Sequence, residues 1–374
     1  MISFYALVLL MVAIGLARLA PSTPVPDAQL PRISVIVACR NEETDLPVCI
    51  EALTRLDFPK DKLEILLVDD RSTDRTALII AEAARRHPHI RSLSTAGMAE
   101  GGLQAKARGV ALAAREATGE WLFITDADAE VAPGWIRYML SRTDARTGII
   151  AGMMLGKGGT LPGLVERMSW AYTLPFAFGL AGWGATWLCV GPNMAVRRKA
   201  YLDAGGLEAA DFTIAEDLAI FRLVFSQGYG AVAHASPETT VRMSPVPSVR
   251  HLLSQQRRWL KGGFEGPWYV NAGLIFTFGF HFVMSALMIG GWFIAPVPTA
   301  AAWVVKLLSD TVMISVEGRR IGARGLPLLT PLLVVFTVPA FLWLPPSLVL
   351  SPGVRWMGDG YAVTYPPLRR ETPP

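Results

Sequence analysis

The sequence is poor in charged residues, which make up 18% of its 374 residues, whereas an average soluble protein carries roughly 25%. Hydrophobic residues make up 52%, and the mean hydropathy is +0.36. This balance is untypical of a soluble protein and favours one attached to a membrane. The length corresponds to roughly two domains.

Cysteine and blocks of basic residues are also scarce. Cys39, Cys49 and Cys189 are too few and too scattered for a disulfide framework or a zinc site, so we expect buried, reduced thiols in a cytosolic domain. The formal net charge is +4, but no Lys/Arg-rich block occurs. The mild excess favours attraction to anionic lipid head groups or nucleotide phosphates, and no nucleic-acid partner is expected.

An uncharged run occupies residues 2–17, just short of the ~20 residues that a membrane-spanning helix needs. A secretory signal peptide is the alternative. No positive region precedes the run, however, and Arg18 and Arg32 follow it. These features favour an N-terminal transmembrane anchor over residues 1–19 with its C-terminal side in the cytoplasm, followed by a proline-rich linker over 20–31.

Residues 32–268 are more polar, and strand-like runs alternate in them with helix-like runs. The strands are expected at residues 33–37, 63–68 and 121–125, and helices at 43–56 and 73–86. This order predicts an α/β domain with a mostly parallel sheet flanked by helices, whose ligands bind beyond the carboxyl ends of the strands. All three strands run directly into polar motifs, which we therefore expect at one edge of the sheet.

Three apolar stretches follow, at residues 272–294, 295–316 and 326–350, and we predict about three C-terminal transmembrane segments over 270–350. The second carries only Lys306 and Asp310 as charges. A net-positive loop is expected at residues 317–324, on the cytoplasmic side. The third stretch contains five prolines and either spans or dips and re-emerges. Residues 351–374 form a tail.

Residues 161–187 are strongly apolar as well, although they lie between the acidic motifs at 126–128 and 216–217. A single membrane crossing here would put those carboxylates on opposite sides of the bilayer. We therefore expect interfacial helices in the head-group layer with their aromatic side chains facing lipid. An ordinary buried core helix is the alternative.

Two acidic pairs follow predicted strands. Asp126 and Asp128 lie at a turn, where two carboxylates can bind a divalent cation that bridges phosphate oxygens. Asp69 and Asp70 end another strand, where a carboxylate can accept a hydrogen bond from a uracil imide or a ribose hydroxyl. Each pair by itself also fits ordinary turn or capping chemistry.

Two further motifs lie closer to the C-terminal apolar stretches. Glu216 and Asp217 begin a predicted helix, where a carboxylate can either take a proton from an acceptor hydroxyl or simply complement the helix dipole. Residues 255–259 combine Arg258, which can neutralise a departing diphosphate, with Trp259, which can stack on a sugar. These arginines also fit snorkelling charges beside a membrane.

As a set, these residues resemble the family 2 glycosyltransferases, in particular the membrane-bound branch that includes cellulose synthase, ceramide glucosyltransferase and hopanoid-associated enzymes. The resemblance covers residues 33–265 and implies a GT-A type nucleotide-diphospho-sugar transferase domain. The matching segments are 37–43, 68–74, Lys106, 125–128, 191–198 with Gly205 and Gly206, 215–218, and 255–259.

The resemblance also implies roles for individual residues. Asp217 is the implied general base. Asp126 and Asp128 hold the metal and diphosphate, with Mg²⁺ or Mn²⁺ as the cofactor and Asp128 as its direct ligand. The implied substrate-binding residues are Ala38, Arg40, Glu42, Asp69, Asp70, Lys106, Asp126, Glu216, Gln255, Arg258 and Trp259.

We thus expect an integral membrane protein whose cytoplasmic domain moves one sugar from a nucleotide sugar, a UDP-sugar by preference, to a hydroxyl of a membrane lipid. A single displacement inverts the anomeric carbon, so an α-linked donor gives a β-glycoside. The alternatives are a processive polysaccharide synthase of the cellulose or hyaluronan synthase type, a non-catalytic membrane scaffold with a transferase fold, and a nucleotidyltransferase. The sequence leaves the sugar, the acceptor and the metal open.

Overall fold

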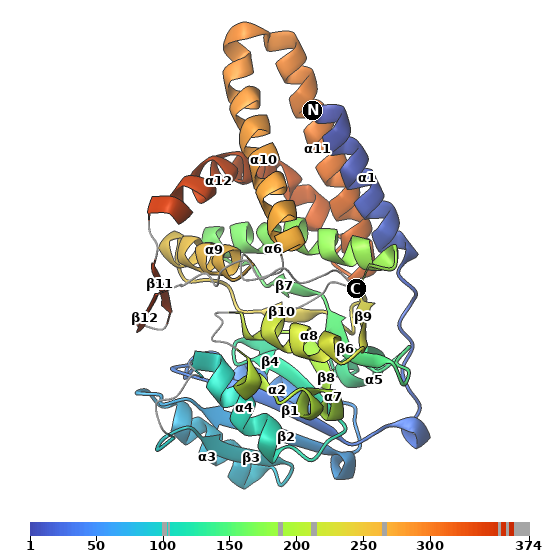
Figure 1. Ribbon diagram of the computed structural model, residues 1–374, viewed down its shortest axis with the longest axis vertical. Helices are drawn as coiled ribbons and strands as arrows, with labels where there is room; N and C mark the ends of the chain where they lie inside the picture. The colour runs from blue at the N-terminus through green and yellow to red at the C-terminus, as the bar shows by residue number, and fades with distance from the viewer. Residues whose placement is uncertain are drawn as a thin grey trace.

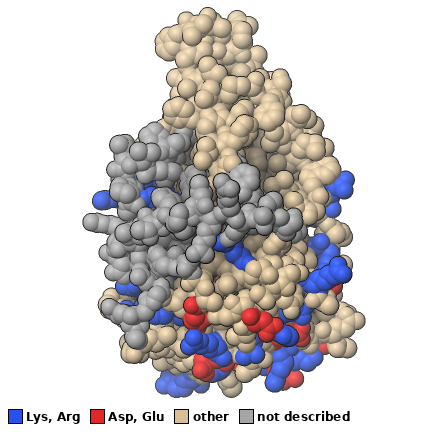
Figure 2. Space-filling view, viewed as in Figure 1, with Lys and Arg blue, Asp and Glu red and all other residues tan. Residues whose placement is uncertain are grey.

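The computed structural model describes residues 1–98, 103, 105–185, 190–210, 215–263, 268–350, 353–356 and 359–362. An α/β domain lies at one end of the molecule, and long helices rise from it (Figure 1). Charged side chains gather on the α/β domain, whereas the upper helices show none on the face seen in Figure 2. The two parts therefore differ in their surface chemistry.

The main sheet has seven strands in the order β3-β2-β1-β4-β8-β6-β9. Strands β1 to β4 are parallel to one another, whereas β8 is antiparallel to both β4 and β6. The parallel-rich sheet and its three predicted strands are confirmed. The bounds are β1 Ile33–Cys39, β2 Leu63–Asp69, β3 Ile90–Ser94, β4 Trp121–Asp126, β6 Thr147–Gly152, β8 Met194–Arg197 and β9 Gly230–His234.

Helices cover both faces of this sheet. Successive strand residues point to opposite faces, so each central strand contributes side chains to the apolar core on either side. Val35 belongs to the apolar core shared with α2 and α3, and Ile36 belongs to the core shared with α4. A small sheet of order β5-β10-β7 begins directly after Asp128. The bounds are α2 Leu46–Thr54, α3 Thr76–Arg86, α4 Ala105–Glu116, α5 Trp135–Met139, α7 Arg198–Asp203, α8 Glu216–Ser226, β5 Ala129–Glu130, β7 Met154–Gly156 and β10 Val241–Met243.

The helices α2 and α3 begin three residues later than predicted, because the loops before them bind each other. The Asn41 side-chain oxygen accepts a hydrogen bond of 2.8 Å from the Thr73 N–H, and Asp74 accepts one of 3.1 Å from the Glu43 N–H. Asn41 adopts a left-handed backbone with φ of 56°. These contacts use the residues that would have formed the first turns of the helices.

Among the residues that the structure describes, two helices are long and apolar enough to cross a membrane, within residues 275–294 and 296–320. They form a hairpin, with α1 beside its second arm (Figure 1). The 17-residue α1 is shorter than the roughly 20 residues that a membrane-spanning helix needs. The bounds are α1 Ile2–Arg18, α6 Leu161–Gly182, α9 Val249–Gly263, α10 Trp268–Ile294, α11 Pro296–Arg320, α12 Thr330–Leu350, β11 Gly353–Trp356 and β12 Asp359–Ala362.

Two details of the predicted apolar segments are wrong. The loop expected at 317–324 begins only after Arg320, because α11 continues and Glu317 is completely buried in it. The aromatic side chains of residues 161–187 do not all face outward as expected, because Tyr172 and Phe178 of α6 are buried in the core shared with α1.

Cys39 and Cys49 are buried free thiols as expected, and Cys189 lies outside the described residues.

Helices α1 and α6 approach so closely that their contact requires glycine. A Cβ atom on Gly182 would lie 1.8 Å from the carbonyl oxygen of Gly15, and a Cβ atom on Gly179 would lie 2.8 Å from that of Val12. Small residues allow such backbone contact between apolar helices. The α1 helix is therefore fixed to the rest of the molecule along α6.

A buried polar network joins four of these helices. Lys306 Nζ lies 2.7 Å from Asp310 Oδ2 within α11, and Tyr5 of α1 donates a hydrogen bond to the other oxygen of Asp310. The Tyr172 hydroxyl of α6 lies 3.0 Å from the Tyr5 hydroxyl and 2.9 Å from His281 Nε2 of α10. The two charges of the second apolar stretch thus neutralise each other inside the bundle.

Candidate active site

The carboxyl ends of the central strands bring the first two acidic motifs to one edge of the sheet. In the strand register Ala38 lies opposite Asp126, and Cys39 lies opposite Asp69. The strand order reverses between β1 and β4, the point at which α/β sheets leave a crevice for ligands. The expected convergence of the strand ends is confirmed.

Lys106 of α4 joins this edge to the third motif. Its Nζ lies 2.5 Å from Asp126 Oδ1 and 2.8 Å from Glu216 Oε1. Burial opposes the charge on Lys106, but the carboxylates of Asp126 and Glu216 outweigh it and raise the pKa of the amine well above its usual range. One ammonium group therefore holds the end of β4 against the start of α8.

The acidic residues around Asp128 repel one another. Burial and then the charge of Asp126 raise the pKa of Asp128 to about 7. Burial and then the charge of Asp128 raise the pKa of Glu42 to about 8. Within the described residues no group of three or more His, Cys, Asp or Glu side chains has the geometry of a metal site. The pair of Asp126 and Asp128 nevertheless fits a hard divalent cation, because it offers carboxylate oxygens with an excess of negative charge.

Asp217 lies at the start of α8 and is held by backbone donors. Its Oδ2 accepts a hydrogen bond of 2.9 Å from the Gly191 N–H, and its Oδ1 accepts one of 2.9 Å from the Leu218 N–H. Thr125 of β4 donates a 2.8 Å hydrogen bond to the carbonyl oxygen of Pro192, which fixes the same loop. Burial, followed by the charge of Glu216, raises the pKa of Asp217 to about 6. This carboxylate is ionised at neutral pH but binds a proton more tightly than an ordinary aspartate does.

The motif at 255–259 lies on α9, and α6 holds it. Gln256 donates a 3.0 Å hydrogen bond to Ser169, and the rings of Trp259 and Trp170 lie 4.0 Å apart between centroids. Burial lowers the pKa of Arg258. The nearby charges of Glu216, Asp126 and Asp128 oppose this effect in part. The arginine therefore faces the same carboxylates that Lys106 joins.

Asp70 does not belong with this group. Its Oδ1 accepts hydrogen bonds of 2.9 and 2.7 Å from the guanidinium of Arg108 and one of 2.5 Å from Thr95. The side chain is 2% exposed, so a substrate cannot reach it. We therefore correct the prediction for Asp70, which ties β2 to α4.

Ala38 also packs against α4. A Cβ atom built on Gly109 of that helix would lie 2.9 Å from the Cβ atom of Ala38.

Helix α6 contributes residues to the site that the motifs in the sequence do not indicate. Glu166 is 2% exposed and accepts a 3.1 Å hydrogen bond from the Val246 N–H. Burial raises the pKa of Glu166, and the hydrogen bonds from Val246 and Gln255 oppose this rise only in part. Ser169 and Trp170 lie one turn further along and contact Gln256 and Trp259 of the α9 motif. Glu166, the only acidic residue in an apolar stretch, was the available signal.

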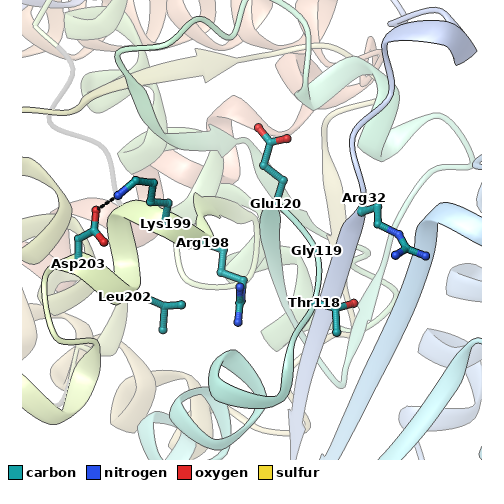
Figure 3. A pocket seen from close by; sticks show the side chains of 8 residues that line it. All are labelled: Arg32, Thr118, Gly119, Glu120, Arg198, Lys199, Leu202 and Asp203. Carbon is teal, nitrogen blue, oxygen red and sulfur yellow. Dashed lines mark hydrogen bonds and ion pairs between the residues drawn. The ribbon is translucent and has the colours of Figure 1, made fainter.

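A cavity of about 460 Å³ lies at the opposite edge of the sheet. Arg32 and Glu120, which line it, immediately precede β1 and β4, so the cavity is at the amino ends of these strands. Figure 3 shows Lys199 turned toward Asp203, with which it forms an ion pair of 2.6 Å. None of the residues lining this cavity belongs to the four motifs, so it is separate from the candidate site.

The chain is similar to several known glycosyltransferases. It is 28% identical to the probable glycosyltransferase YdaM of Bacillus subtilis over 54% of this chain and 48% of that protein. It is also 28% identical to a beta-monoglucosyldiacylglycerol synthase of a Nostoc species over 63% of this chain and 50% of that protein. The chain thus spans about half the length of these curated relatives.

A solved structure with the same fold is the mannosyltransferase PcManGT of Pyrobaculum calidifontis, in complex with GDP-Man and Mn²⁺. The TM-score is 0.50 at 19% identity, covering 93% of this chain and 97% of that one. A family model describes nearly the entire sequence, over residues 1–367. The chain is therefore an enzyme that belongs to glycosyl transferase family 21.

Proposed function

We propose that this glycosyltransferase moves one sugar from a nucleotide-diphosphate sugar, a UDP-sugar by preference, to a hydroxyl of a membrane lipid with inversion at the anomeric carbon. The single observation that carries the proposal is the position of Lys106, which contacts both Asp126 and Glu216. This contact holds the predicted diphosphate-binding motif against Glu216, the residue that precedes the proposed base Asp217. The similarity to a beta-monoglucosyldiacylglycerol synthase supports a lipid acceptor.

The donor binds at the carboxyl edge of the sheet in this proposal. Ala38, Arg40, Glu42 and Asp69 contact the nucleotide, and Lys106 contacts the diphosphate. Asp126 and Asp128 would hold a divalent cation, Mg²⁺ or Mn²⁺. When bound, it supplies positive charge to the diphosphate oxygens and so makes the nucleotide a better leaving group.

Asp217 acts as the general base. It accepts the proton of the acceptor hydroxyl while that oxygen forms a bond to the anomeric carbon and the bond from this carbon to the diphosphate breaks. The nucleoside diphosphate departs with the electron pair, and Arg258 stabilises its charge. Gln255 and Trp259 close over the diphosphate and the acceptor. The pKa of about 6 suits Asp217 to this role, because the carboxylate is free to accept a proton at neutral pH.

The acceptor reaches the site from the membrane. We propose that α1 and the hairpin of α10 and α11 lie in the bilayer with the α/β domain on its cytoplasmic side, and that α6 lies at the interface. The apolar outer face of α1 supports this placement, since Leu7, Leu10 and Ile14 are exposed on it. A lipid hydroxyl would then leave the head-group layer to meet Asp217.

The experiment is a transfer assay with the full-length protein in lipid nanodiscs, labelled UDP- and GDP-sugars, and diacylglycerol or ceramide as acceptors. We expect one labelled sugar per lipid, in β linkage, from a UDP-sugar. A long water-soluble polymer as product would contradict the single transfer.

The base is tested with Asp217→Asn, which keeps the shape of the side chain but removes its proton affinity. We expect kcat to fall about 10²–10⁴-fold, with binding of the nucleotide sugar retained. Asp203→Asn is the matched control, because it makes the same chemical change on the exposed surface of α7. Full activity in Asp217→Asn would refute the assignment of the base.

A further inference from the structure

A cavity of about 390 Å³ lies where α11 ends beside the α/β domain. Ser315, Arg319, Arg324 and Pro327 line it. Figure 1 shows α11 running from the tip of the hairpin down toward the α/β domain. None of the lining residues belongs to the candidate active site.

The two arginines of this cavity have no protein partner in the described part of the chain. Arg319 and Arg324 are both exposed, and neither forms a hydrogen bond or an ion pair there. Their neighbour Arg320 differs, because it donates hydrogen bonds of 3.3 and 2.7 Å to the carbonyl oxygens of Ala17 and Leu19. The cavity therefore presents two guanidinium groups that are available to an anion.

An exposed apolar stripe on α11 leads to this cavity. Val304, Leu308 and Val312 are 56%, 60% and 50% exposed, and their spacing of four residues puts them on one side of the helix. Ser315 and Arg319 follow on the same side at intervals of three and four residues. One face of α11 is thus apolar away from the α/β domain and cationic next to it.

We propose that this face binds an anionic phospholipid of the bilayer. The phosphate lies in the cavity between Arg319 and Arg324 with Ser315 as a further donor, and an acyl chain follows the stripe of Val304, Leu308 and Val312. Guanidinium groups bind phosphate oxygens through paired hydrogen bonds, and the cytoplasmic leaflet supplies anionic headgroups. The site goes beyond the transfer reaction and rests on it only through the proposed insertion of α11 in the membrane.

The test is a titration of the purified full-length protein in detergent with phosphatidylglycerol or phosphatidylcholine of the same acyl chains, followed by native mass spectrometry. We expect tighter binding of the first phosphatidylglycerol than of phosphatidylcholine. In Arg319→Ala/Arg324→Ala the Kd for phosphatidylglycerol should rise about thirtyfold, as expected for the loss of two basic groups that each contribute about 1 kcal/mol beside an anionic headgroup. The Kd for phosphatidylcholine should not change.

Two variants control for folding and for charge. Arg319→Lys/Arg324→Lys retains the charge and should keep most of the preference, and Arg85→Ala/Arg86→Ala removes the same charge from the exposed end of α3 and should keep all of it. Equal affinities for both lipids in the wild type, or an unchanged preference in the Ala double variant, would overturn the proposal. Displacement of the lipid by glycerol phosphate in large excess would also overturn it, because the apolar stripe would then contribute nothing. The titration needs no sugar donor, so its outcome is independent of the transfer assay.

Discussion

Lys199 and Asp203 on α7 form an ion pair of 2.6 Å, and Lys306 and Asp310 on α11 form one of 2.7 Å. Both pairs have the same residue types at the same spacing of four along a helix. The side chains of the first are 74% and 46% exposed, whereas those of the second are 2% and 0% exposed. The local pattern of the two pairs is identical. Their exposure to water differs, and it decides how much each pair contributes to the stability of the fold.

The environments also differ in how charge is balanced. In the helical part Lys306 faces one carboxylate, whose second oxygen is bound by Tyr5, so no acceptor remains unpaired at Asp310. In the α/β domain Lys106 serves two carboxylates at once, and Asp128 and Glu42 lie nearby with raised pKa values. The buried pair of Lys306 and Asp310 is therefore neutral as a unit, whereas the carboxylates of the candidate active site outnumber the ammonium group of Lys106 that joins them.

The largest effect should come from breaking the buried pair. Asp310→Asn leaves the ammonium of Lys306 uncompensated and should lower the free energy of unfolding by about 3–5 kcal/mol. Asp203→Asn should lower it by less than about 1 kcal/mol, because water screens an exposed pair. Thermal unfolding in detergent measures both changes. Equal losses in the two variants would contradict the difference between the two environments.

Removal of divalent cations should act on the α/β domain without unfolding it. Chelation with EDTA should reduce transfer at least about 100-fold, because the charge of the diphosphate then remains uncompensated. Mg²⁺ or Mn²⁺ should restore activity, and Asp128→Asn should prevent that restoration. Unchanged transfer after chelation would remove the metal from the proposal.

The contact between α1 and α6 offers a test in the helical part. In Gly182→Ala the new Cβ atom would overlap the carbonyl oxygen of Gly15, so the helices must separate at a cost of about 1–3 kcal/mol. Gly279→Ala in α10 is the matched control, since a Cβ atom there meets nothing within 4 Å. A lower unfolding temperature only in Gly182→Ala is the expected result, and equal temperatures would contradict the close contact.

The pH dependence of transfer should reflect Asp217. Its pKa of about 6 means that the carboxylate is ionised and active above pH 6 and becomes protonated as the pH falls through that value. The value of kcat/KM should therefore fall about tenfold for each pH unit below 6. The residual activity of Asp217→Asn should lack this decline. A decline that persists in this variant would assign the titration to another group.

The smallest effect is expected where α6 supports α9. Trp170→Ala removes a ring contact worth about 0.5–1.5 kcal/mol, so kcat/KM should fall about threefold to tenfold as Trp259 loses its position. Trp170→Phe should restore most of the activity because an aromatic ring remains. A normal kcat/KM in Trp170→Ala would show that Trp259 is positioned without α6.

Much of the α/β domain was predictable because its central strands are buried on both faces. Such strands read as continuous apolar runs, and three of them were found within two residues of their observed ends. The antiparallel strand β8 is not predicted by the sequence, since its four residues give too short a pattern. The helices α2 and α3 lack the first turns that the sequence predicts, because the loops before them bind each other through residues that are 32 and 31 positions apart in the chain.

The order of the acidic motifs and their places at the ends of parallel strands follow from the sequence alone, because strand periodicity and the geometry of parallel sheets are local rules. The sequence does not determine which residues these carboxylates pair with. Asp69 and Asp70 are neighbours in the chain, yet only the tertiary structure buries Asp70 against Arg108, and only it joins Asp126 to Glu216 through Lys106. The physical reason is that ion pairs form between groups brought together by packing, over separations in sequence that no local pattern records.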